Sequence, residues 1–150
     1  MKKIALALVG LTLAASAAAQ MKPEDAIKYR QSAYSTMSWS MGRIKANVEG
    51  NYNKDEVIKA ANVLQSLANS GMGALYLPGT DKGKGWEETR VKPELFTNKE
   101  LAGKVATDFN REANEMAKVA ATGDAAAAKA QFGKLGETCK GCHDEFRINK

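Results

Sequence analysis

The residues best suited to chemistry lie in one short segment near the C-terminus, Cys139-Lys140-Gly141-Cys142-His143. It holds both cysteines and the only histidine of the 150-residue chain. C-x-x-C-H is the attachment signature of a c-type haem, in which two cysteine sulfurs bond to vinyl groups and the adjacent imidazole binds the iron. On a helix, Cys139 and Cys142 share one face at a spacing of i, i+3. The pattern therefore predicts one covalently attached haem c.

Three other kinds of site use similar residues. A redox-active C-x-x-C pair belongs in a βαβ context, whereas the sequence around Cys139 has a helical pattern. A structural zinc site normally takes four ligands, and cysteine and histidine supply only three here. A plain disulfide between Cys139 and Cys142 remains open, but it leaves the position of His143 without a reason.

The first nineteen residues have the composition of a secretory signal peptide. A basic pair, Lys2 and Lys3, precedes an apolar stretch from Ile4 to Ala15 and a small-residue cleavage site ending at Ala19. The apolar stretch is shorter than the about 20 residues of a membrane-spanning helix. We therefore expect cleavage, export to a bacterial periplasm, and no membrane insertion of the remaining domain, residues 20–150.

The charge of the chain is mild. The formal net charge is +5, to which the predicted signal peptide contributes two lysines. Basic and acidic residues are interspersed, which is typical of a solvated surface. Nucleic-acid binding is therefore not expected, and a weak preference for acidic redox partners is all that the charge indicates.

Four segments with helical periodicity make up most of residues 20–150, and no convincing strand alternation is present. Their apolar positions recur three and four residues apart, so each segment has an apolar face that can pack into a bundle. The segments are predicted over Pro23–Gly50, Asn53–Gly71, Thr97–Gly123 and Asp124–Phe146.

The ends of these segments carry capping signals. Asn53-x-x-Glu56 and Thr97-x-x-Glu100 are capping boxes, and glycines follow the predicted helix ends. Cys139 and Cys142 occupy apolar-face positions, so the haem is expected inside an antiparallel four-helix bundle. The glycine-rich stretch 71–92 predicts a long crossover, with one short turn near Pro93, that covers one edge of the prosthetic group.

The sequence resembles the cytochromes c′, the class II c-type cytochromes, whose haem motif also lies at the C-terminus. The resemblance is carried by Lys22–Gln31, Lys92–Phe96 and Cys139–Arg147, while the central crossover diverges. It implies an all-α, antiparallel four-helix bundle with haem c in its core.

By position, the resemblance implies that His143 is the axial iron ligand, with Cys139 and Cys142 as thioether anchors. Arg147, one turn beyond His143, matches the proximal arginine of the family. The alternative to a role at the haem is that Arg147 is a solvent-exposed charge near the end of the chain.

Arg30 matches an arginine that meets a haem propionate, and Gln31 follows it in the same motif. An arginine on an apolar face also needs a charge partner on physical grounds, unless its head reaches solvent at the end of the bundle. Thr89 is a further candidate for contact with a propionate.

Tyr34 falls where the family places a bulky residue over the open face of the iron, and Met37 follows one turn later. Core packing fits the position of Tyr34 equally well. The chain has one histidine, so two histidines of one chain cannot both bind the iron, and residues 26–33 lack the methionine that binds iron in low-spin relatives.

These observations predict a five-coordinate, high-spin haem that can undergo one-electron redox chemistry, and the resemblance implies that it binds NO and CO. The alternative is a low-spin electron shuttle with a methionine as sixth ligand and no role in gas binding. No distal His/Arg pair for an enzyme is present, and the redox partner is not identified. The resemblance also implies a homodimer through the first two helices, where Trp39 lies off the apolar face.

Overall fold

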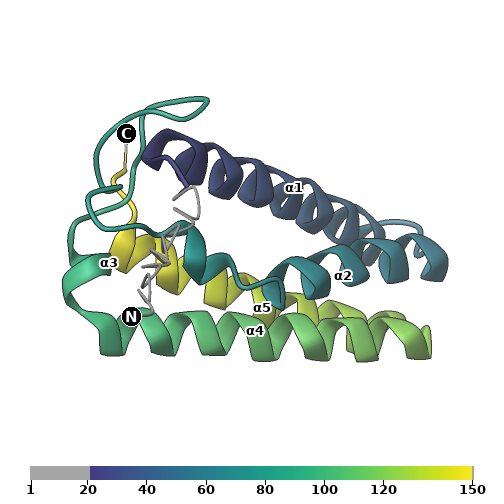
Figure 1. Ribbon diagram of the computed structural model, residues 1–150. Helices are drawn as coiled ribbons and strands as arrows, with labels where there is room; N and C mark the ends of the chain where they lie inside the picture. Colours follow the sequence, from purple (N-terminus) through teal and green to yellow (C-terminus); the bar gives the residue numbers. More distant parts are fainter. Residues whose placement is uncertain (1–20, 150) are drawn as a thin grey trace, which may run out of the picture.

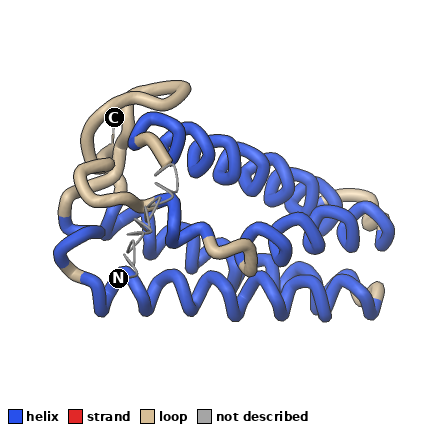
Figure 2. Tube along the Cα trace, in the orientation of Figure 1, coloured by secondary structure: helices blue, strands red, loops and turns tan. Residues whose placement is uncertain are grey.

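The structure is a computed structural model that describes residues 21–149. The predicted signal peptide lies outside the described residues. Within them the chain is all-α, and the extended pairings are two isolated bridges, Lys84 with Glu88 and Val91 with Arg147. Four long helices form the body of the molecule (Figures 1 and 2): α1 (Pro23–Glu49), α2 (Lys54–Ala68), α4 (Lys99–Thr122) and α5 (Ala125–Phe146).

The helices form the predicted antiparallel bundle. α1 packs against α2 and α5, and α4 packs against the same two neighbours. Short connections join α1 to α2 and α4 to α5, whereas a long crossover joins α2 to α4. The crossover therefore lies at the end of the bundle where α1 begins and α5 finishes (Figure 1). That end also carries the C-x-x-C-H motif.

Local side-chain chemistry explains where the helices begin. The Asn53 side chain accepts a hydrogen bond from the Glu56 amide at 3.2 Å, as predicted. Asp124 caps α5 by accepting from the amides of Ala126 and Ala127. These side chains satisfy amide donors that have no partner within the first turn of a helix.

Two predicted helix limits are wrong. The cap of α4 is Asn98, whose side chain accepts from the Leu101 amide, and not Thr97. Thr97 instead ends the short helix α3 (Glu94–Thr97), which is the turn expected near Pro93. α2 ends at Ala68 rather than near Gly71, because Asn69 closes the helix and Gly71 adopts a positive φ of 77°.

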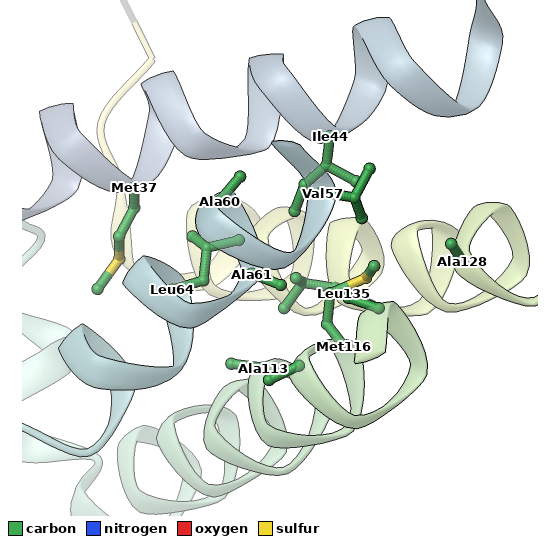
Figure 3. Packing of buried hydrophobic residues seen from close by; sticks show 12 residues of the cluster. Met37, Ile44, Val57, Ala60, Ala61, Leu64, Ala113, Met116, Ala128 and Leu135 are labelled. Carbon is green, nitrogen blue, oxygen red and sulfur yellow. The ribbon is translucent and has the colours of Figure 1, made fainter. Parts of the chain in front are cut away.

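A hydrophobic cluster fills the bundle away from the crossover. Ile44 of α1 and Val57 of α2 point toward each other there (Figure 3). Many members are alanines, which allow the helices to approach closely and bury little side-chain volume each. The cluster consists of Met37, Ile44, Val57, Ala60, Ala61, Leu64, Ala113, Met116, Ala117, Ala120, Ala128 and Leu135.

The crossover, residues 69–98, is folded against α1. It contains a 3-10 turn, η1 (Met72–Leu75). The glycine-rich sequence of this stretch did not predict that turn. Gln31 of α1 donates to the Glu87 carbonyl at 3.0 Å and accepts from the Trp86 amide at 2.8 Å. Trp86 also donates from its indole to Ser32 at 2.8 Å. One side of α1 thus anchors the middle of the crossover.

Gly85 is required where the crossover meets α1. A Cβ atom at this position would lie 2.7 Å from the backbone nitrogen of Lys28 and 2.9 Å from Cγ2 of Ile27. Replacing Gly85 by Ala should therefore displace the crossover and lower the free energy of unfolding by about 1–3 kcal/mol. Urea unfolding followed by circular dichroism measures the change.

The matched control is Gly133→Ala in α5, where an added Cβ has no neighbour within 4 Å. Alanine at an open helical position should raise the free energy of unfolding by up to about 1 kcal/mol. Equal effects of the two replacements would contradict the close approach at Gly85.

Candidate haem site

The two cysteines lie near the C-terminal end of α5, and both thiols are free and half-buried. Burial raises the pKa of the Cys139 thiol, and burial with the neighbouring Cys139 raises that of Cys142. Both sulfurs are therefore protonated at neutral pH. A pair of neutral thiols one helical turn apart is the donor set that addition to two vinyl groups requires.

His143 is exposed and lies beside Arg147. Nη1 of Arg147 is 3.3 Å from Nδ1 of His143. A guanidinium only donates hydrogen bonds, so this contact requires a tautomer of His143 in which Nδ1 carries no proton. The structure thus brings the predicted axial ligand and proximal arginine together, in a contact that depends on the tautomer.

The end of α5 is held by the crossover. The Lys92 amide donates to the Phe146 carbonyl at 2.9 Å, and the Ile148 amide donates to the Arg90 carbonyl at 2.8 Å. The side chain of Phe146 is buried. These contacts fix the last turn of α5, which directly follows the two cysteines of the C-x-x-C-H motif, against the chain that precedes α3.

Arg30 of α1 is 2% exposed, so the alternative in which its head reaches solvent is wrong. Its Nη1 donates to Thr80 Oγ1 at 2.7 Å and to the Leu75 carbonyl at 3.4 Å. Its Nη2 donates to the Thr80 carbonyl and, at 2.8 Å, to Thr89 Oγ1. The guanidinium lies over the ring of Tyr76, 5.0 Å from its centroid.

These contacts occupy four of the five N–H groups of Arg30. Within residues 21–149 only its Nε–H is left without an acceptor. Burial lowers the pKa of Arg30, and neutral oxygens of the crossover compensate for the lost water. The structure brings Arg30 and Thr89 together, whereas the contact of each with a propionate stays a prediction. A two-bond contact with a propionate would require Arg30 to release part of the crossover.

Tyr34 of α1 forms a hydroxyl pair with Tyr76 of the crossover, with the two oxygens 2.7 Å apart. Although Tyr34 is 43% exposed, burial of its hydroxyl raises its pKa, and the hydrogen bond with Tyr76 acts in the opposite direction. Burial also raises the pKa of Tyr76. Both hydroxyls therefore keep their protons at neutral pH.

Two predicted pocket residues have their contacts elsewhere. The amide group of Gln31 binds the backbone of the crossover. Met37 is 6% exposed and packs at one edge of the hydrophobic cluster (Figure 3). A contact of either side chain with haem stays a prediction.

Tyr76 and Thr80 were not predicted from the sequence as part of the site. Both lie in the crossover, where no periodicity marks an inward-facing side chain. Their separation from Arg30 and Tyr34 is more than 40 residues, so no spacing pattern could have revealed the contacts.

The residues at this end of the bundle fit a haem. Ala113, Met116 and Leu135 are fully buried, whereas Cys139 and Cys142 are only half-buried. The thiols of the motif are therefore accessible to a large apolar group that attaches to them.

Comparisons with known proteins agree with this arrangement. The family model described as cytochrome C′ matches residues 25–147. A cytochrome c′ of Rhodocyclus tenuis is 62% identical over 127 residues, covering 84% of this chain and 96% of the relative. A cytochrome c′ of Allochromatium vinosum is 55% identical over 144 residues, covering 95% of this chain and 94% of the relative.

Solved structures show the same likeness. The crystal structure of cytochrome c′ from Thermochromatium tepidum superposes with a TM-score of 0.83 at 53% sequence identity, and the match covers 87% of this chain and all of that one. The family model spans nearly all of the described residues, and it includes the two half-buried thiols and the adjacent imidazole. The chain therefore belongs to the cytochrome c′ family, and its cofactor is haem c.

Proposed function

We propose that the protein is a periplasmic cytochrome whose haem iron is five-coordinate and high-spin and binds NO and CO on its open face. Cys139 and Cys142 would anchor the haem, and His143 would bind the iron. Bound haem supplies an iron centre that takes a diatomic ligand or exchanges one electron. The surrounding protein decides between these uses through polarity, donors and access.

The position of the methionines carries this proposal. Met37 and Met116 belong to the hydrophobic cluster, and Met41 and Met72 pack against it. Met21 precedes α1 and is 40% exposed. Thioethers engaged in a packed core fill space rather than bind metal, so this placement argues against the low-spin alternative with a methionine as sixth ligand.

Tyr34 supplies the proposed wall of the open face. Its hydroxyl binds Tyr76 of the crossover, at the end of the bundle that carries the C-x-x-C-H motif, and its ring is bulky enough to admit small diatomics in preference to larger ligands. A relative supports the choice of ligand: a nitric oxide complex is solved for a variant of cytochrome c prime from Alcaligenes xylosoxidans, 31% identical with a TM-score of 0.77.

Arg147 and Arg30 would serve at different edges of the haem. Arg147 already contacts His143 and would set the orientation of the imidazole. Arg30, joined by Thr89, would present its remaining Nε–H toward a propionate. Within residues 21–149 no His/Arg pair faces the proposed open side, since the one histidine, His143, contacts Arg147; we propose a binding and electron-transfer role rather than an enzymatic one.

Export and assembly complete the proposal. The signal peptide over residues 1–19 would direct the chain to the periplasm, and within residues 21–149 no helix is long and apolar enough to cross a bilayer.

Trp39 on α1 is 61% exposed, with the Arg43 guanidinium 4.7 Å from its ring centroid. A homodimer through α1 and α2 would cover it. A cytochrome c′ 54% identical to this chain is described as showing ligand-controlled dimer dissociation.

The coordination state is tested by spectroscopy of the purified holoprotein. We expect high-spin absorption and resonance Raman bands in both oxidation states, and a large change when CO is added to the reduced protein. Low-spin bands at rest, lost in Met37→Leu or Met41→Leu, would contradict the proposal.

The role of Tyr34 is tested by Tyr34→Ala. Removing the ring should increase the CO association rate by about ten-fold, which corresponds to about 1.4 kcal/mol of barrier. Stopped-flow mixing of the reduced protein with CO measures this rate. Tyr29→Ala is the control, because Tyr29 lies on the outer face of α1 and is 56% exposed. An unchanged rate in Tyr34→Ala would remove Tyr34 from the open face.

A further inference from the structure

Tyr76 is the polar partner of Tyr34 among the described residues, and the two come from different elements. Tyr34 lies in α1, whereas Tyr76 follows directly after η1 in the crossover. Their oxygens are 2.7 Å apart, which is the usual length of a hydrogen bond between hydroxyls. The two groups share one hydrogen bond, so one of their two protons remains available to another acceptor.

Tyr76 is held in place from several directions. Its amide donates to the Gly73 carbonyl at 3.1 Å. One ring face meets the Arg30 guanidinium at 5.0 Å, and its ring packs against Phe96 at 6.4 Å with an interplanar angle of 60°. Tyr34, by contrast, is 43% exposed. Tyr76 is thus the fixed member of the pair, and Tyr34 takes its orientation from it.

Either hydroxyl of the pair can donate in this hydrogen bond. When Tyr76 donates to the oxygen of Tyr34, Tyr34 keeps its own proton for another acceptor. A hydroxyl that accepts a hydrogen bond is itself a stronger donor.

We propose that Tyr76 is a positioning residue that aims and strengthens the Tyr34 hydroxyl as a hydrogen-bond donor toward a diatomic ligand on the iron. This inference rests on the proposed function, since it places the ligand beside Tyr34. The crossover would therefore contribute to ligand discrimination. A hydroxyl donor aimed at the bound ligand favours diatomic ligands whose outer atom gains negative charge on binding over diatomic ligands that remain apolar.

The test compares Tyr34→Phe, Tyr76→Phe and the double variant in the holoprotein, with Tyr29→Phe as control. The first readout is the infrared C–O stretching frequency of the reduced CO adduct, which falls when a donor contacts the bound ligand. We expect Tyr34→Phe to raise the frequency, Tyr76→Phe to raise it by a smaller amount, and the double variant to match Tyr34→Phe. The control should leave it unchanged.

The second readout needs no gas. Each single variant should lower the folding equilibrium constant in urea by up to about five-fold, equivalent to about 1 kcal/mol for one hydrogen bond. The double variant should lower it little further, since one shared bond is lost in all three. Additive losses would show that the pair is not coupled and would overturn the inference.

The outcomes separate this inference from the proposed function. A shift in Tyr34→Phe with none in Tyr76→Phe overturns the positioning role and leaves Tyr34 on the open face. A lower C–O stretching frequency in Tyr76→Phe also overturns the positioning role. That result would mean that Tyr34 donates its proton to Tyr76 and becomes free to donate to the ligand only when the Tyr76 hydroxyl is removed. No shift in either variant overturns the donor role of the pair and leaves the proposed function standing, because CO still binds. Failure of the protein to form a CO adduct overturns the proposed function and this inference with it.

Discussion

The buried guanidinium of Arg30 is the interaction on which the haem end of this molecule depends. A charge removed from water must find hydrogen-bond partners or it destabilises the fold. Arg30 finds them in Leu75, Thr80 and Thr89, so a long segment without helical periodicity is drawn onto α1. The ring of Tyr76 closes over the same guanidinium. A single buried charge thus specifies the path of the crossover, because few other paths would satisfy it.

Two ends of the bundle meet different physical demands. Alanines and a few larger side chains from the four long helices form a buried, closely packed cluster that stabilises the bundle. Near the C-x-x-C-H motif, half-buried apolar side chains, free thiols and a hydroxyl pair leave a surface suited to a porphyrin. The packed end can hold the helices in place while the other end accepts a large rigid group.

The crossover positions residues on both sides of the proposed haem. Gln31 and Ser32 fix its middle on α1, Arg30 fixes its buried threonines, and backbone pairing with Phe146 and Ile148 fixes its end on α5. Groups near both sides of the proposed haem are therefore positioned by one segment. His143 and Arg147 lie on the α5 side, whereas Tyr34 and Tyr76 lie where α1 meets the crossover. A change in this segment can act on ligand binding without touching the iron ligand.

Local chemistry in the sequence was sufficient for the helices and for the attachment motif. Capping by Asn53, the turn near Pro93, the apolar faces and the C-x-x-C-H spacing all depend on residues within a few positions of one another, so they can be read along the chain. The cap at Asn98 was misplaced by one residue because Thr97 and Asn98 are both competent caps, and the preceding α3 uses Thr97. The tertiary structure alone decided the partners of Arg30 and Tyr34, at sequence separations of 50 and 42 residues. Such contacts leave no local pattern, since they arise only when a buried charge and a non-repetitive loop fold against the same helix.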